Sequence, residues 1–238
     1  MSGNAARLAA EAVRGRLVAR AAQEFGVEAG AVDLAESRAF VIDAPDRSMT
    51  LEDLVALCAA EGIHRSELAM FRAPFTDEID PETGQGRVHP DYAFGAHAIE
   101  VAVDTETGEV TVLKSIGAHD VGQAINPAAV AGQIEGGAAQ GQGFALSEAM
   151  IYREGQLMTP SFSEYLIPTA MDMPRVQSII LESRSGLGPF GAKGIGEPAL
   201  TPVAPAIANA VADAIGTRVF ELPITPERVV AAIERAES

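Results

Sequence analysis

The feature that most constrains the fold of this chain is a glycine-rich stretch, GPFGAKGIGEP, at residues 188–198. Its four glycines and two prolines make a helix or a strand unfavourable, because each glycine loses much backbone entropy when it is ordered. The sequence therefore predicts a long loop whose backbone amides can approach another group closely. The apolar helical pattern ALTPVAPAIANAVADAI comes next and predicts a buried helix from residue 198 to about residue 215.

Glu197 is the only carboxylate in this loop. A lone acid between a flexible glycine run and a buried helix is a candidate general base, held by its backbone and shielded from water. The alternative is a glutamate in the first turn of a helix that only counters the helix dipole. Both interpretations place Glu197 at the start of the helix that follows the loop.

A second unusual stretch, PAAVAGQIEGGAAQGQGFAL, has a helical period and begins after Asn126, a natural N-cap, with Pro127 as the first helical residue. Five glycines lie inside it, and each costs about 1 kcal/mol of helix stability relative to alanine. Such a cost is expected where another backbone or a ligand occupies the space of a side chain. Gln133 and Gln140 lie two turns apart on one side and offer uncharged amide groups. The alternative is close helix packing with two surface glutamines.

The rest of the chain predicts an α+β fold with mixed helices and short antiparallel sheets. The predicted helices cover residues 2–25, 51–62 and 226–236, and the predicted strands cover residues 32–34, 39–42 and 176–183. Residues 93–117 predict a hairpin that turns at residues 105–108, and residues 149–168 predict a second hairpin that turns at residues 154–155. Residues 72–93 are rich in proline, glycine and acidic side chains and predict an extended surface connection.

The charge balance argues against nucleic acid and anionic membranes as partners, because 33 acidic residues outnumber 17 lysines and arginines and give a formal net charge of −16. We find no apolar run with the length of a signal peptide or a membrane span, so we expect a cytoplasmic protein. Cys58 is the only cysteine and is expected to be a small buried side chain. One cysteine cannot form a disulfide framework, a cysteine zinc site or an iron–sulfur cluster within this chain.

Two smaller motifs allow other interpretations of the loop. Gly186, Gly188 and Gly191 satisfy the G-x-G-x-x-G pattern of dinucleotide-binding proteins, but no helix is predicted before residue 198, so the context is poor. Lys193 could reach a phosphate as a point charge, whereas an ordinary surface lysine is the default expectation.

The four histidines are scattered and show no paired metal-ligand spacing. His119 stands beside Asp120 and before a glycine, an arrangement that could form a structural pair in a turn. No metal ligand is predicted in the chain.

The two glycine-rich stretches, AGQIEGGAAQGQGFALSE and GPFGAKGIGEP, together resemble those of the molybdenum hydroxylase family, which includes xanthine dehydrogenase and aldehyde oxidase. HDVGQAINP and EVAVDTETGEV also resemble segments of its molybdopterin-binding subunit. The resemblance implies that Glu197 is the general base beside the molybdenum, that Gln133 hydrogen-bonds the pterin and that the backbone of Gly196 lies against the metal site. Gln140 and Lys193 occupy positions similar to those of the family motifs, but the resemblance assigns them no definite role. It implies no protein ligand to the metal.

The resemblance covers residues 1–238 as the C-terminal part of that subunit, with the motifs in residues 93–238 and a helical and extended part in residues 1–92. It implies a molybdopterin cofactor, as such or as its cytosine dinucleotide, with a 2Fe-2S cluster and FAD on partner subunits. The remaining, N-terminal part of the subunit is then expected on another polypeptide, in a split or truncated arrangement. The implied substrate is a heterocycle or an aldehyde. The alternatives are an assembly piece without catalysis and, more weakly, a dinucleotide-binding protein.

Overall fold

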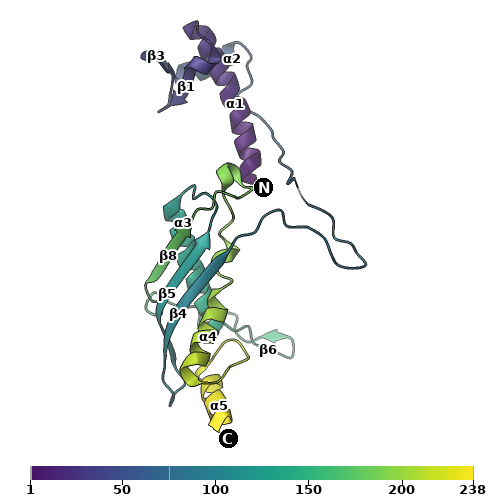
Figure 1. The fold of residues 1–238 in the computed structure, drawn as a ribbon, viewed down its shortest axis with the longest axis vertical. Coiled ribbons are helices and arrows are strands. Elements are labelled where there is room, and N and C mark those ends of the chain that lie inside the picture. The colour runs from purple at the N-terminus through teal and green to yellow at the C-terminus, as the bar shows by residue number, and fades with distance from the viewer. Residues whose placement is uncertain (1, 75, 238) are drawn as a thin grey trace. The chain divides into compact units, whose positions relative to one another are not determined.

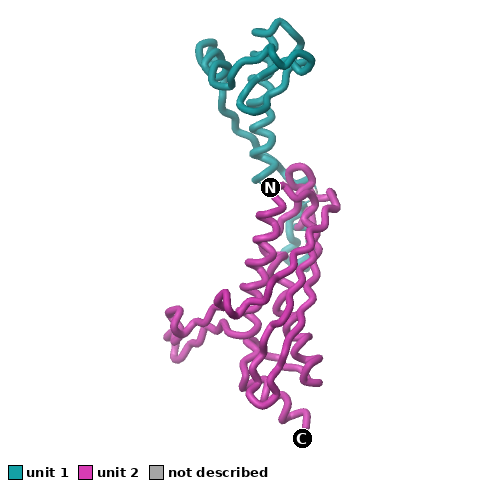
Figure 2. The backbone as a smooth tube through the Cα atoms, turned by 90° about the vertical axis from the view of Figure 1, so that its left-hand side faces the viewer, with its two compact units in different colours: residues 1–88 teal, residues 89–238 magenta. Residues whose placement is uncertain are grey.

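The structure, a computed structural model, describes residues 2–74 and 76–237, which form two compact units, Met1–Val88 and His89–Ser238 (Figure 2). Each unit has a hydrophobic core of its own. Both combine helices with a small sheet, which confirms the predicted α+β class (Figure 1).

The first unit packs two helices against a three-stranded antiparallel sheet. Its elements are α1 (Ser2–Phe25), the short helix η1 (Ala29–Ala31), β1 (Val32–Ala35), β2 (Arg38–Val41), β3 (Ala44–Thr50) and α2 (Leu51–Ala60). The core brings together buried side chains from α1, α2 and the sheet, among them Ala21, Leu54 and Cys58, so Cys58 is buried as predicted. The Thr50 hydroxyl accepts a hydrogen bond from the Asp53 amide and so caps the N-terminus of α2.

Strand β3 was not predicted, because its sequence APDRSMT contains a proline and two charged residues and has little strand propensity. It forms through antiparallel pairing with β2, in which Ala39 lies opposite Met49. Pairing with a neighbour thus overrides local preference at this edge of the sheet.

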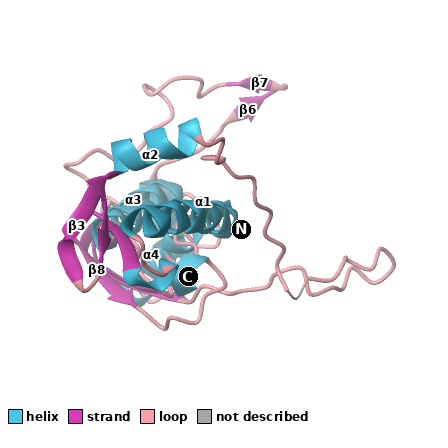
Figure 3. Ribbon diagram, turned by 90° about the horizontal axis from the view of Figure 1, so that it is seen from above, coloured by secondary structure: helices cyan, strands magenta, loops and turns pink. Residues whose placement is uncertain are grey.

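The second unit is built on a three-stranded sheet in the order β4-β5-β8. Its elements are β4 (Gly95–Val103), β5 (Val110–Asp120), α3 (Pro127–Leu146), β6 (Tyr152–Arg153), β7 (Gln156–Leu157), β8 (Val176–Leu181), η2 (Pro189–Gly191), η3 (Glu197–Ala199), α4 (Val203–Ile215) and α5 (Pro226–Glu237). β4 and β5 form the predicted antiparallel hairpin, and α3 and α4 run along the sheet (Figure 1). β6 and β7 form a two-stranded ribbon within a long loop (Figure 3).

The sheet differs from the prediction in one respect, because β8 pairs with β5 in parallel and not antiparallel. Parallel neighbours need a long crossover connection, and α3 lies in the segment that supplies it. α3 itself starts as predicted, since the Asn126 side chain accepts a hydrogen bond from the Ala129 amide over 3.0 Å and Pro127 is the first helical residue.

The helix after the glycine-rich loop begins later than predicted. Glu197–Ala199 form the separate short helix η3, and α4 starts only at Val203. An α-helix from residue 198 would need an amide of residue 202 to donate to the carbonyl of residue 198, and Pro202 has no amide hydrogen. The chain therefore turns at η3 before the buried helix begins.

Candidate active site

The glycine-rich loop is fastened to the end of β5 by backbone hydrogen bonds. The Lys193 amide donates to the Val121 carbonyl over 2.8 Å, and the Arg184 amide donates to the Gly122 carbonyl over 3.0 Å. Gly122 adopts a φ of +67°, and a Cβ there would stand 2.0 Å from the Gly191 carbonyl oxygen. Glycine at position 122 is therefore required both by the backbone conformation and by the close approach of the loop.

An ion pair strengthens this attachment. Lys193 Nζ lies 2.7 Å from Asp120 Oδ2, and both side chains are largely buried, with 6% and 13% of their surface exposed. The Lys193 ammonium also lies 5.4 Å from the centre of the Phe94 ring. The hydrogen bond from Lys193, joined by the amide of Gly122, lowers the pKa of Asp120 far below its usual range, so this carboxylate is charged at neutral pH. The expectation that Lys193 is an ordinary surface lysine was wrong.

Glu197 lies at the first position of η3, where its backbone is firmly held. Its carbonyl oxygen accepts hydrogen bonds from the amides of Leu200 and Thr201 and from the Thr201 hydroxyl. Among the residues that the structure describes, the Glu197 carboxylate has no hydrogen bond or ion pair of its own. The residue is exposed, so the expected shielding from water is not provided by this chain.

Glu197 lines a hollow of about 330 Å³. The hollow is walled by two segments, one at residues 91–93 and the other being the end of the glycine-rich loop, and its lining residues are Asp91, Tyr92, Ala93, Lys193, Gly194, Gly196, Glu197 and Pro198. The segments are tied together, because the Leu187 amide donates to Asp91 Oδ2 over 2.8 Å.

The five glycines of α3 divide into two sets. A Cβ at Gly137 would stand 2.7 Å from the backbone of Ala199 in η3, and one at Gly141 would stand 2.4 Å from Val203 Cβ in α4. Gly143 is also packed, against Glu148 and Pro168. Gly132 and Gly136 are exposed and have open space where a Cβ would lie. Within the packed set, Gly137 lets α3 lie against η3, the short helix that begins at Glu197, and Gly141 lets it lie against α4.

Gln133 and Gln140 are exposed residues of α3, and so are Gly132 and Gly136. Gln133 lies one helical turn before Gly137, the residue that contacts η3. Gly196 is exposed, has an ordinary φ of −64° and has open space at its Cβ position, so neither backbone conformation nor packing within the chain requires a glycine there.

Two histidines of the hairpin, the buried His119 and the partly buried His97, form a pair that was not predicted from the sequence. His97 Nε2 and His119 Nε2 lie 3.0 Å apart, and His119 is fully buried. A Cβ at Gly95 would stand 2.4 Å from His119 Nδ1, and one at Gly117 would stand 2.5 Å from His97 Nε2, so two glycines make room for the rings. The expected turn pair of His119 with Asp120 was wrong, since each side chain has a different partner.

Burial and the neighbouring His119 lower the pKa of His97 to about 4, and burial also lowers the pKa of His119. The pair is therefore neutral at physiological pH. The signal for it was present in the sequence as two histidines on paired strands, but its use required the register of the hairpin.

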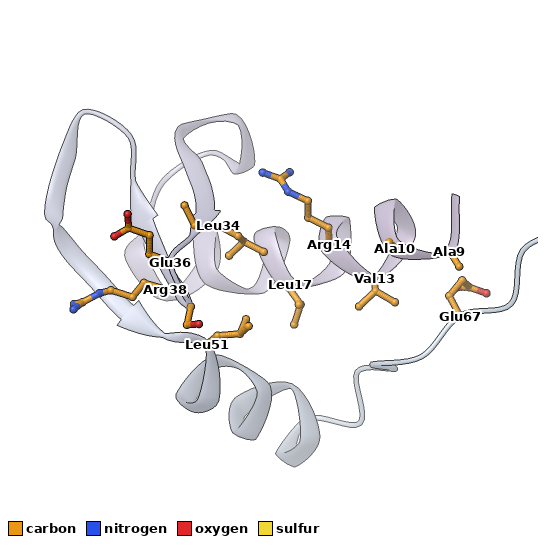
Figure 4. A pocket seen from close by; sticks show the side chains of 12 residues that line it. Ala9, Ala10, Val13, Arg14, Leu17, Leu34, Glu36, Arg38, Leu51 and Glu67 are labelled. Carbon is orange, nitrogen blue, oxygen red and sulfur yellow. The ribbon is translucent and has the colours of Figure 1, made fainter. Parts of the chain in front are cut away.

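A second hollow, of about 570 Å³, lies in the first unit between α1 and the sheet. Val13 and Leu17 of α1 and Leu51 at the start of α2 point into it (Figure 4). Neither glycine-rich motif contributes to its lining, whereas the end of the loop at residues 188–198 lines the smaller hollow at Glu197.

Within residues 2–74 and 76–237, no group of three or more histidine, cysteine, aspartate and glutamate side chains could hold a metal ion. In the same residues no helix combines the length and the apolar character needed to cross a membrane. The glycine motif at residues 186–191 contains the three-residue helix η2 and is followed by loop, whereas a dinucleotide-binding motif opens a full α-helix, so the geometry gives no support to that alternative.

The fold and the two glycine-rich stretches define a molybdopterin-binding protein. The family model of the molybdopterin cofactor-binding domain matches residues 1–174, and the chain belongs to this family, that of the molybdenum hydroxylases. This confirms the resemblance drawn from the sequence and the molybdopterin cofactor that it implied.

Named relatives agree. The chain is 36% identical over 198 residues to the gamma subunit of the 6-hydroxypseudooxynicotine dehydrogenase complex of Paenarthrobacter nicotinovorans, covering 79% of this chain and 25% of the relative. It is 35% identical over 239 residues to a probable hypoxanthine oxidase of Escherichia coli K12, covering 98% of this chain and 23% of that protein. The crystal structure of quinoline 2-oxidoreductase from Pseudomonas putida 86 superposes with a TM-score of 0.73 at 30% identity, over 94% of this chain and 28% of that one. The chain thus spans about a quarter of the length of these relatives.

Proposed function

We propose that this chain contributes part of the active site of a molybdenum-dependent hydroxylase, with Glu197 as the general base. The observation that carries the proposal is Glu197, which lines an open hollow at the end of a glycine-rich loop and whose carboxylate has no hydrogen bond or ion pair among the described residues. The alternative role, in which Glu197 only stabilises a helix dipole, is weak here, because η3 is a single three-residue turn and its dipole is small.

Two exposed parts of the second unit, the end of the glycine-rich loop and the surface of α3 around Gln133, offer groups that suit the molybdopterin cofactor. Open space at Gly196 and at Gly132 and Gly136 leaves backbone groups accessible to a large ligand, and none of these glycines is required by contacts within the chain. Gln133 offers an uncharged amide that can both donate and accept hydrogen bonds to a pterin. We propose that Gln133 binds the pterin and that the backbone of Gly196 lies against the metal end of the cofactor.

The proposed roles divide between the cofactor and the chain. When bound, the molybdenum cofactor supplies the two-electron oxidation that a hydroxylation with water as the oxygen source requires. Glu197 accepts a proton from the attacking oxygen, and it must stand within hydrogen-bond reach of that oxygen to do so. The backbone hydrogen bonds at its carbonyl hold its main chain while the side chain remains free to reach the substrate.

We propose further that the chain works within a complex. Its relatives include a subunit of a named dehydrogenase complex, and the chain spans about a quarter of that subunit. The partner polypeptides would carry the remainder of the molybdopterin-binding subunit, a 2Fe-2S cluster and FAD, and the substrate would be an electron-poor heterocycle or an aldehyde. Residues 1–238 together would form the C-terminal part of the molybdopterin-binding subunit, and residues 93–238 would make the cofactor contacts.

Glu197→Gln tests the base in the complex purified by co-expression with these partners. The substitution keeps the size of the side chain and removes its ability to accept a proton, so turnover should fall by about 100-fold or more. The molybdenum content should stay close to that of the wild type, because the cofactor contacts are unchanged. Glu106→Gln is the matched control, since Glu106 is an exposed glutamate in the hairpin turn, and it should leave turnover unchanged.

A second candidate is an assembly piece without a catalytic role, which the exposed large apolar side chains favour, such as Met171 at 93% and Phe220 at 88% exposed. The same experiment separates the two. Wild-type turnover in a Glu197→Gln complex that retains molybdenum would refute the proposed base and favour the assembly role.

A further inference from the structure

We propose that Asp120 and Lys193 form a positioning pair that fixes the location of Glu197 in the active site. The inference rests on the proposed role of Glu197 and assigns to two further residues a function in placing it. The pair joins β5 to the glycine-rich loop across 73 positions of sequence, with its charged atoms 2.7 Å apart and both side chains largely buried.

The pair is built as a unit. Asp120 Oδ1 accepts hydrogen bonds from the amides of Gly122 and Ser183, at 3.0 and 3.3 Å, which leaves Oδ2 for the Lys193 ammonium. One carboxylate thereby holds together the end of β5, the chain just after β8 and the lysine of the glycine-rich loop. A charged hydrogen bond that is shielded from water is stronger than an exposed one. This contact can therefore fix the position of Lys193 relative to the end of β5.

The segment between Lys193 and Glu197 has little packing of its own. Gly194 and Gly196 are exposed and have open space at their Cβ positions, and Ile195 between them is only partly buried. The location of Glu197 is therefore set by the two ends of the segment. The downstream end is held by η3, where Ala199 is buried against Gly137, and the upstream end is held at Lys193.

If this is correct, removal of the ion pair should loosen the loop and displace Glu197 while the sheet and α4 stay folded. Hydrogen exchange of the full chain measures this directly. In Lys193→Met, the amides of Gly188 and Lys193 should exchange about 10- to 100-fold faster, and those of α4 should be unchanged. Glu221→Gln is the control, since it breaks the exposed pair of Glu221 with Arg228 in the same unit and should leave the loop amides unchanged.

Lys193→Met leaves a carboxylate without its partner and could impair folding, so a second variant is needed. Asp120→Asn combined with Lys193→Met keeps an acceptor oxygen for the two amides and leaves no unpaired charge. It should show the same loss of protection in the loop, with no further loss beyond Lys193→Met. Loop amides that exchange at the wild-type rate in this double variant would overturn the inference.

A kinetic readout separates positioning from mere support. In the complex, Lys193→Met should lower kcat, measured per bound molybdenum, by about 10-fold or more and leave KM nearly unchanged. The reason is that a displaced base weakens stabilisation of the transition state and not binding of the substrate. In a Glu197→Gln background the same substitution should have no further effect on kcat. An additive effect in that background would overturn the positioning role.

The two proposals fail in different ways. Wild-type turnover in Glu197→Gln would remove the base assignment and with it the positioning role, even if the ion pair still protected the loop amides. Loss of turnover in Glu197→Gln together with unchanged loop exchange in the Lys193 variants would overturn the positioning role alone.

Discussion

Two adjacent glycines of α3 provide a direct test of how the helix supports the active site. Gly137 packs on η3, where a Cβ would stand 2.7 Å from both the carbonyl carbon and the Cβ of Ala199. Gly136 is exposed, and a Cβ there meets nothing within 4 Å. The variants Gly136→Ala and Gly137→Ala therefore add the same methyl group to the same helix in two opposite environments.

The expected magnitudes follow from these contacts. At Gly136 the substitution removes the helix penalty of glycine and should stabilise the unit by about 1 kcal/mol. At Gly137 the same gain is opposed by overpacking, which costs about 1–3 kcal/mol because normal carbon contacts lie at about 3.5–4.0 Å and the backbone of η3 must move. The free energies of unfolding of the two variants should therefore differ by about 1–3 kcal/mol, with Gly137→Ala the less stable.

Urea unfolding followed by tyrosine fluorescence suits this comparison. The three tyrosines, Tyr92, Tyr152 and Tyr165, all lie in the second unit, and the chain has no tryptophan, so the signal reports that unit alone. With a slope of about 2 kcal/mol per molar urea, the two midpoints should lie about 0.5–1.5 M apart. Equal midpoints, or a higher midpoint for Gly137→Ala, would refute the view that α3 and η3 are in tight backbone contact.

Two other outcomes can be checked on the same footing. Burial lowers the pKa of His97 to about 4 in the folded chain, whereas in the unfolded chain this histidine binds a proton near pH 6.5. The contribution of neutral His97 to the free energy of unfolding is therefore fully present above pH 6.5 and is lost as the pH falls toward 4. The loss amounts to up to on the order of 3 kcal/mol. Urea midpoints at pH 7 and pH 4.5 measure this loss, which should be smaller in His97→Gln, and an equal loss in the variant would contradict it. Gly196→Ala should leave the unfolding midpoint unchanged, because the backbone conformation and the surrounding space accept a side chain. Both Gly196→Ala and Gln133→Ala should lower the molybdopterin content of the purified complex. Full cofactor content in both variants would contradict the proposed cofactor contacts.

Much of the local structure could be predicted from the sequence, because it depends on signals that lie within a few residues. Asn126 followed by Pro127 specifies where α3 starts, and Thr50 caps α2. The glycine-rich loop at residues 188–198 was evident because four glycines and two prolines within eleven residues disfavour a long helix or strand. Pro202 also carried the signal for the late start of α4, through its missing amide hydrogen, although the apolar pattern pointed to an earlier start.

The partners of the site residues depend instead on register and on contacts between distant segments. A β-bulge between Glu100 and Val101 shifts the pairing of β4 with β5 by one residue, and this shift places His97 opposite Gly117. Without it, counting back from the hairpin turn would pair His97 with Ile116, and a slip of one residue turns every side chain to the other face.

The sequence by itself determined the residue types of the proposed active site: an acid at the end of a glycine-rich loop and amide groups on a glycine-rich helix. Only the tertiary structure decided which glycines of α3 are packed and which are open, and that Lys193 is buried against Asp120. The physical reason is that propensities and caps act within one turn or one hairpin, whereas these pairings form between elements tens of residues apart, where neighbouring residue types carry no information about the partner.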